Sequence, residues 1–133
     1  MGIELEGCCT LLQVFEMPQS IRFYRNLIGF EVVDWAPPGE EPGWCLLRLG
    51  GADLMLNSQF GQDPRPAGPD PERAAYHDDT VPFSGCRDLD AAYRHLQSNG
   101  IEVDPPSFSH YGMRQLSPKD PDGYDLCFQW PGG

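Results

Sequence analysis

The sequence predicts an α+β fold made of two successive units, each with the order strand, helix and three strands. The first observation is an internal repeat: residues 51–56 (GADLML) return as residues 123–128 (GYDLCF), and residues 29–32 (GFEV) return as residues 100–103 (GIEV). The two pairs keep the same order and nearly the same offset, 72 and 71 residues. The second observation is that segments with apolar residues at every second position alternate with segments of helical spacing. Such a repeat indicates that one structural unit is duplicated.

The first unit spans residues 8–58. Its predicted elements are a strand at 9–15, a helix at 18–28, and strands at 30–36, 44–49 and 52–57. Pro18 suits the first turn of a helix, where its missing N–H is not needed. The helix is expected to end at Gly29, which tolerates a left-handed backbone. Two glycines at 50–51 separate the last two strands and predict a hairpin.

The second unit, residues 80–131, repeats this order. Its predicted elements are a strand at 80–86, a helix between Asp88 and Asn99, and strands at 101–104, about 109–117, and 124–130. Asp88 is a favourable N-cap, and apolar residues then recur at helical spacing. A proline in the second position and a closing glycine predict a turn at 120–123. Residues 59–79 are rich in proline and are expected to link the two units, so that residues 1–133 form a single domain.

The composition disfavours several kinds of partner. The formal net charge is −11, which argues against binding to nucleic acid or to an anionic membrane surface and favours cationic ligands. No apolar stretch approaches the roughly 20 residues of a membrane-spanning helix. The five cysteines include no CxxC pair, so neither a disulfide framework nor a zinc ribbon is predicted. We expect reduced thiols and a cytoplasmic protein.

Three short motifs occur together in this framework: SIRFY at 20–24 and LIGF at 27–30 in the first helix, and DPDG at 120–123. With the two units, they make the chain from Cys9 to Trp130 resemble the vicinal oxygen chelate superfamily, which includes glyoxalase I, extradiol dioxygenases, and bleomycin- and fosfomycin-resistance proteins. The resemblance implies two tandem βαβββ modules whose curved mixed sheets surround an open, U-shaped cavity, with the helices outside. It also implies a homodimer with pockets near the interface.

Strand periodicity indicates which side chains face that cavity, because alternate residues point to opposite sides of a sheet. One face is apolar and is expected to pack on the helices. It is formed by Leu12 and Val14, by Leu54 and Leu56, and by Leu126 and Phe128. The other face is mixed and is expected to line the cavity. It carries Cys9, Leu11 and Gln13, then Asp53, Met55 and Asn57, then Asp125, Cys127 and Gln129, and in the family register Val81, Phe83 and Gly85.

The resemblance also indicates where metal-dependent relatives hold their ion, with one ligand in the first strand and one in the last strand of each module. These positions are occupied here by Cys9, Met55, Val81 and Cys127. A divalent ion such as Mg²⁺ or Ni²⁺ needs oxygen or imidazole donors, and valine has none. We therefore expect no metal and no other cofactor. Three sulfur donors leave a soft, Cu(I)-type site as an alternative to simple apolar packing.

The three histidines are not expected to replace the missing ligands. His77, beside the linker, is expected at the surface, and His95 on the solvent face of the second helix. His110 is the one histidine that the sequence places near the cavity. No nucleophile–base motif accompanies it, and Cys8 and Cys9 have no nearby basic residue that would lower a thiol pKa. No catalytic residue is therefore assigned.

These observations predict a metal-free small-molecule binding protein that sequesters an aromatic, cationic or neutral ligand such as an antibiotic, and thereby a role in antibiotic resistance. Aromatic rings would stack on the ligand, and carboxylates or amides would anchor it. The predicted ligand-binding residues are Gln13, Trp35, Trp44, Asp53, Asn57, Phe83, Tyr111, Arg114, Asp125 and Gln129. Arg114 could bind a ligand anion or form an ion pair with surface acids instead. The alternative is an enzyme of the same superfamily, a lyase, isomerase or dioxygenase-like protein, with no metal or an atypical one.

Overall fold

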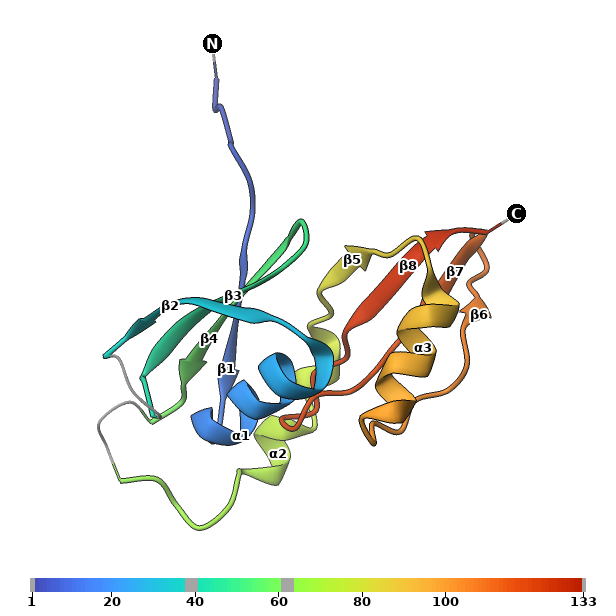
Figure 1. The fold of residues 1–133 in the computed structure, drawn as a ribbon. Coiled ribbons are helices and arrows are strands. Elements are labelled where there is room, and N and C mark those ends of the chain that lie inside the picture. The colour runs from blue at the N-terminus through green and yellow to red at the C-terminus, as the bar shows by residue number, and fades with distance from the viewer. Residues whose placement is uncertain (1, 38–40, 61–63, 133) are drawn as a thin grey trace.

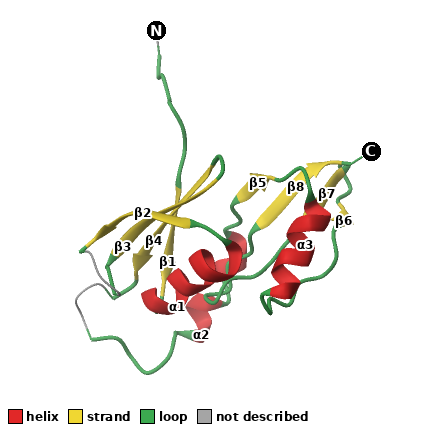
Figure 2. Ribbon diagram, viewed as in Figure 1, coloured by secondary structure: helices red, strands yellow, loops and turns green. Residues whose placement is uncertain are grey.

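Two four-stranded sheets form the framework of the protein. The structure is a computed structural model, and it describes residues 2–37, 41–60 and 64–132. Across the first sheet the strands are β1 (Thr10–Val14), β4 (Ala52–Ser58), β3 (Trp44–Leu49) and β2 (Glu31–Ala36). Across the second sheet they are β5 (Phe83–Gly85), β8 (Cys127–Pro131), β7 (Met113–Leu116) and β6 (Ser107–Phe108). Figures 1 and 2 show the two sheets side by side, with helices packed against each.

The two sheets have the same topology. In each, the first strand is parallel to the last and the other neighbours are antiparallel. A helical segment follows the first strand of each module: α1 (Met17–Ile21) continued by η1 (Arg22–Ile28), and α3 (Leu89–Ser98). The prediction of an α+β fold with two tandem βαβββ modules is therefore confirmed. In the described part of the chain, no helix is both long and apolar enough to cross a membrane.

The second module is less regular than its sequence predicts. Residues 101–104 were expected to form a strand, and this prediction is wrong: they are not in a strand, and β6 lies at Ser107–Phe108. The prolines at 105–106 explain the shift, because proline donates no hydrogen bond to a sheet and restricts the residue before it. Pro82 similarly lies outside β5, which is shorter than the predicted strand at 80–86. Strands β7 and β8 also differ from their predicted bounds, 109–117 and 124–130.

The first helix changes its geometry along its length. After α1, residues 22–28 form a π-helix, and the amide of Gly29 donates to the carbonyl of Tyr24, five residues earlier, at 3.0 Å. Gly29 has φ of +119° and ends the helix in the left-handed conformation that the sequence predicts. The wider turn brings Phe23, Tyr24 and Ile28 into the buried layer between the helix and the first sheet.

The core lies between the helices and the faces of the sheets that the sequence identifies as apolar. On the first sheet the residues that are at most 5% exposed are Leu12, Val14, Cys45, Leu47, Leu54 and Leu56. They pack with α1 and η1 in one cluster, which Leu89 and Leu96 of α3 join from the second module. The prediction that the apolar faces pack on the helices is confirmed. The opposite face of each sheet therefore points away from the core.

A polar junction joins the two modules. Its centre is the turn 120–123, whose side chains reach from the second module to the first helix. The hydroxyl of Tyr24 donates to Asp120 at 2.7 Å, and Asp122 accepts from Ser20 Oγ at 3.2 Å and from the amide of Phe15 at 2.8 Å. Asp120 is only 5% exposed, and it also accepts from two amides of its own turn. These bonds satisfy the buried carboxylate of Asp120 and the partly buried carboxylate of Asp122, and they fix the modules against each other.

The linker reaches the same junction. Within residues 59–79 the chain forms α2 (Pro71–Ala74) and a short 3₁₀ turn, η2 (His77–Asp79). His77 was expected at the surface, and this prediction is wrong, because its residue is only 8% exposed. Its ring stacks on Tyr124 with centroids 4.1 Å apart, and Nδ1 lies 2.6 Å from the carbonyl oxygen of Asp122. The linker folds back onto the second module, which its proline-rich composition did not indicate.

The junction makes stability depend on pH. Burial raises the pKa of Asp120 to about 6 from an ordinary value of 3.8, because the charged form loses its hydration. The folded protein therefore holds this proton more tightly than the unfolded chain. The stabilising contribution is fully present below pH 3.8 and is lost as the pH rises through about 6.

We predict that Asp120→Asn, which keeps the shape but cannot titrate, has a flatter dependence of unfolding free energy on pH. Between pH 4 and 6.5 the wild type should lose up to about 3 kcal/mol that the variant retains. Urea unfolding at a series of pH values measures this difference. Asp122, whose pKa burial also raises, is present in both proteins, so the difference between the two profiles reports on Asp120 together with its charge interaction with Asp122. Parallel pH profiles for the two proteins would contradict the assignment.

Candidate ligand-binding site

The first open face is the side of the first sheet that points away from α1 and η1. Residues paired directly on neighbouring strands share a face, and Gln13, Asn57 and Trp44 are paired in one row across β1, β4 and β3. All three are partly exposed. The next row of this face is apolar and consists of Leu11, Met55 and Leu46. Three of the predicted ligand-binding residues therefore lie together, beside an apolar strip.

Asp53 lies on the same face, but its charge is already paired. Its two carboxylate oxygens accept from Nε and Nη2 of Arg48 at 2.7 and 3.0 Å. This hydrogen bond lowers the pKa of Asp53 below its ordinary value. Sequence reasoning missed Arg48, although the hairpin at 50–51 places it directly opposite Asp53. The pair leaves this corner of the face polar with no net charge.

Trp35 lies on the other side of the first sheet. Regular pairing would put it opposite Trp44, but a bulge between Val32 and Asp34 shifts the register, and Trp35 pairs with Cys45. Cys45 is fully buried, and Trp35 packs against the core. One extra residue in a strand reverses which side later residues face. The two tryptophans therefore have different surroundings.

The second open face is the side of the second sheet that points away from α3. Gln115 pairs with Gln129 across β7 and β8, and its Nε2 donates to Gln129 Oε1 at 3.0 Å and to the hydroxyl of Tyr111 at 2.8 Å. Phe83 lies on the same side of β5 and is 55% exposed. Gln115 was missed, although alternation from the buried Leu116 would have placed it on this face. The predicted residues Gln129, Tyr111 and Phe83 thus share one face.

Arg114 lies away from both open faces, and the charge of Asp125 is paired. Arg114 pairs with Trp130 on the side of the second sheet that faces α3, and its guanidinium donates to Asp90 of that helix at 2.7 and 3.3 Å. Of the two roles considered for Arg114, the structure therefore shows the ion pair with a surface acid. Asp125 forms an ion pair with Lys119 at 3.0 Å. The charged side chains that the sequence singled out are thus paired within the chain.

The positions of the family's metal ligands do not fit a metal ion. Cys9 and Met55 belong to the first module, and Val81 and Cys127 to the second. Burial raises the pKa of both thiols, so both are protonated at neutral pH, whereas metals bind the thiolate. Valine donates no electron pair. Among residues 2–37, 41–60 and 64–132 no three His, Cys, Asp or Glu side chains are grouped as a metal ion would require.

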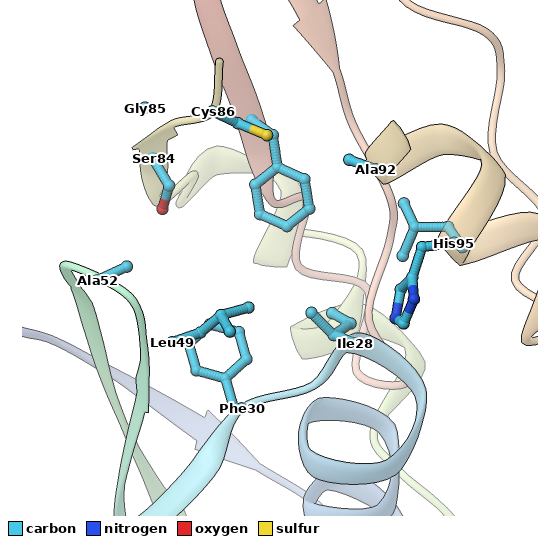
Figure 3. Close-up of a pocket in the computed structure, with 11 residues that line it drawn as sticks. Ile28, Phe30, Leu49, Ala52, Ser84, Gly85, Cys86, Ala92 and His95 are labelled. Carbon is cyan, nitrogen blue, oxygen red and sulfur yellow. The ribbon is translucent and has the colours of Figure 1, made fainter. Parts of the chain in front are cut away.

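An apolar cleft with a volume of about 300 Å³ lies between the modules (Figure 3). Its walls come from the end of η1, the β3–β4 hairpin, β5, β8 and α3. The lining residues are Ile28, Phe30, Leu49, Ala52, Ser84, Gly85, Cys86, Ala92, His95, Leu96 and Phe128. His95 is exposed, as expected, and it also borders this cleft, with Nε2 3.0 Å from the carbonyl oxygen of Leu27. His110 is exposed and contacts the ring of Tyr111, beside the second open face.

Comparison with known proteins identifies the family. The family model described as the glyoxalase/bleomycin resistance protein/dioxygenase superfamily matches residues 9–128. The chain belongs to this superfamily. The resemblance inferred from the sequence motifs is therefore confirmed. A search of curated proteins finds no match.

Solved structures share the fold of this superfamily member. A bleomycin-binding protein from bleomycin-producing Streptomyces verticillus, complexed with copper(II)-bleomycin, superposes with a TM-score of 0.69 and 19% identity, over 99% of each chain. A bleomycin-binding protein complexed with bleomycin gives a TM-score of 0.69 and 21% identity, over 94% of this chain and 98% of the other. A glyoxalase/bleomycin resistance protein/dioxygenase from Nocardioides gives 0.69 and 18%, over 98% and 87%. At these identities the likeness establishes the fold alone.

The Arg48–Asp53 pair can be tested directly. In Arg48→Gln the carboxylate of Asp53 loses its charged donor, so its pKa should rise toward the ordinary value of 3.8. An NMR titration of the aspartate carboxyl resonances measures the change. Arg114→Gln is the matched control and should raise the pKa of Asp90 while leaving that of Asp53 in place. An Asp53 pKa unaffected by Arg48→Gln would show that the carboxylate is free to hold a ligand cation.

Proposed function

We propose that this protein is a metal-free small-molecule binding protein that sequesters an aromatic, neutral or cationic ligand, such as an antibiotic, without changing it chemically. The observation that carries the proposal is the contrast between two sets of residues. The family's metal positions hold two protonated thiols, a thioether and a valine. The open faces instead present amide and aromatic side chains suited to holding a planar molecule.

The first open face supplies an indole ring on which a ligand can stack and two side-chain amides that can form hydrogen bonds with it. Trp44 lies in a row with Asn57 and Gln13, next to an apolar strip. An indole ring stacked on a ligand ring contributes about 0.5–1.5 kcal/mol beyond the area it buries. Each amide hydrogen bond adds a similar net amount, about 0.5–1.5 kcal/mol. These magnitudes support recognition by several moderate contacts rather than by one ionic anchor.

The second open face supplies a connected set of hydrogen-bonding groups. Both Nε2 hydrogens of Gln115 are used, one by Tyr111 and one by Gln129. Within the described part of the chain, this leaves the Gln115 carbonyl, the Gln129 amide hydrogens and the Tyr111 hydroxyl hydrogen for a ligand. Such a set complements a ligand with carbonyl and N–H groups along one edge.

Charge is expected to act at long range rather than by direct pairing. Asp53 and Asp125 are paired with Arg48 and Lys119, so neither carboxylate is a free anchor. The net charge of −11 nevertheless attracts cations toward the protein. Salt screens this attraction, because the Debye length falls from about 30 Å at 0.01 M to about 3 Å at 1 M. Stacking and amide contacts are short-range and persist at high salt.

We further propose that the ligand pocket is completed in a homodimer. Each sheet turns its open face away from the core, which leaves Leu11 44% and Phe83 55% exposed. A two-fold arrangement that sets the first open face of one protomer against the second open face of its partner would cover both. The bleomycin-binding proteins that share the fold are complexed with bleomycin or copper(II)-bleomycin, and a two-sided pocket could surround a bound molecule of this kind.

The proposal predicts different effects for the two tryptophans. Calorimetric titrations would use ethidium, neutral phenanthridine and 1-anthracenesulfonate as cationic, neutral and anionic planar probes, with EDTA present. The cation and the neutral ring should bind more tightly than the anion. Trp44→Ala and Gln129→Leu should each weaken phenanthridine binding about tenfold, since each removes about 1.4 kcal/mol of contacts. Trp35→Phe, on the core side, should leave the affinity unchanged.

Two results would contradict the proposal. Unchanged affinity in Trp44→Ala would show that the first open face does not hold the ligand, and a requirement for added metal would show that the site is not metal-free. Chromatography of each probe after prolonged incubation detects any conversion. Product formation would assign the protein to the enzymes of the superfamily.

A further inference from the structure

The apolar cleft between the modules lies on the opposite side of the sheets from the open faces. Leu49 is on the same face of β3 as the fully buried Leu47, because residues two apart on a strand share a face. In the second sheet Ser84 pairs with Phe128, and both lie on the side that faces α3. The cleft is therefore a continuation of the hydrophobic core and is separate from the open faces.

Both modules contribute walls to this cleft. Figure 3 shows Leu49 and Phe30 of the first module across from Ser84 and Cys86 of the second. Leu49 is 43% exposed although it lies on the core face of its sheet. The core is thus left open where the β3–β4 hairpin approaches β5 and α3. A molecule bound there would contact both modules.

The size and the charge of the cleft restrict what it can hold. Its volume is about 300 Å³, and a dry apolar cavity of about 150 Å³ binds one benzene ring. The cleft therefore has room for a molecule of one or two fused rings. Among the described residues that line it there is no Asp, Glu, Lys or Arg. An ion would lose hydration there without gaining a charged partner, so a neutral molecule is favoured.

The polar groups of the cleft are few. Figure 3 shows the hydroxyl of Ser84 directed toward the hairpin side of the cleft, near Ala52. A hydroxyl can donate one hydrogen bond and accept others. The Nε2 atom of His95 is already engaged with the carbonyl oxygen of Leu27, 3.0 Å away. Burial raises the pKa of Cys86, so its thiol stays protonated at neutral pH and acts as an apolar wall.

We propose that this cleft is a second small-molecule site, which binds a neutral aromatic molecule of one or two fused rings with a single hydrogen-bonding group. The apolar side chains of both modules enclose the rings, and Ser84 binds the polar group. Phenanthridine has three rings and exceeds this space, so the two kinds of probe report on different sites. The cleft site does not depend on the proposed function of the open faces.

The first test locates indole, a neutral two-ring molecule with one N–H donor, on the full chain. In a sample with ¹³C-labelled alanine methyl groups, one bound indole should show nuclear Overhauser effects to the methyl groups of both Ala52 and Ala92. These residues belong to different modules and both line the cleft. Effects at neither methyl group, or only at residues of the open faces, would overturn the proposed site.

Two variants test the walls by calorimetric titration with indole. Leu49→Glu should weaken binding at least about tenfold, because the added carboxylate must lose hydration when the ring enters. Val33→Glu is the matched control: it adds the same charge at an apolar residue of the first sheet that is 42% exposed and does not line the cleft. Ala92→Trp should abolish binding by filling the cleft, whereas Ala91→Trp, one position earlier on α3, should not.

A comparison of indole with 1-methylindole tests the hydrogen bond. Ser84→Ala should weaken indole binding about two- to tenfold, the range expected for one net hydrogen bond. The same variant should leave binding of 1-methylindole unchanged, because that molecule has no N–H to donate. Equal losses for both molecules would show that Ser84 only shapes the wall and would overturn its assigned role.

Three further results would overturn the second site. The first is unchanged indole affinity in both Leu49→Glu and Ala92→Trp. The second is displacement of indole by phenanthridine, which would merge the cleft with the open faces. The third is an indole affinity that falls as the protein concentration rises, which would show that another copy of the chain covers the cleft. Trp44→Ala should weaken phenanthridine binding alone, so failure of the proposed function leaves the indole result readable.

Discussion

The hydrogen bond between the Tyr24 hydroxyl and the buried Asp120 carboxylate is the interaction on which the arrangement of the two modules depends. It joins the first helix to the turn 120–123 across 96 positions of sequence. A carboxylate that is only 5% exposed is costly to bury, and Asp120 is tolerated because Tyr24 and two amides of its turn donate to it. Removing the tyrosine hydroxyl would leave a buried acceptor under-satisfied. The junction therefore holds the modules in one relative orientation.

The orientation of the two modules determines which sides of the two sheets stay exposed. The helices cover the apolar side of each sheet, and the opposite sides of the sheets point away from this core. The charged side chains that the sequence singled out are paired at close range, as Asp53 is with Arg48 on the first open face and Arg114 is with Asp90 on the α3 side of the second sheet. Exposed ion pairs contribute little to stability. Their effect on recognition is larger, because they leave amides and aromatic rings as the groups available to a ligand.

Much of this architecture could be predicted from sequence, and the failures have physical causes. The repeat at offsets of 71–72 residues establishes the duplicated module, and alternation places Leu54 and Leu56 in the core and Asn57 opposite them. The position of Trp35 could not be predicted, because the bulge at Val32 and Asp34 leaves no mark in the pattern of apolar residues. The burial of His77 depends on stacking with Tyr124, a contact made only after the linker folds back. The ion pairs could be predicted only in part. The hairpin at residues 50–51 places Arg48 opposite Asp53, whereas no sequence pattern near Arg114 or Asp90 indicates that these two residues form a pair.

The side-chain amides offer the most direct view of ligand recognition. In an EDTA-treated, ¹⁵N-labelled sample, the NH₂ resonances of Gln13, Asn57, Gln115 and Gln129 report on both open faces without any substitution. Titration with phenanthridine should shift these resonances, together with the indole N–H of Trp44, while the indole N–H of Trp35 stays in place. Shifts confined to residues of the apolar cleft, or no shifts until a metal ion is added, would contradict metal-free recognition at the open faces.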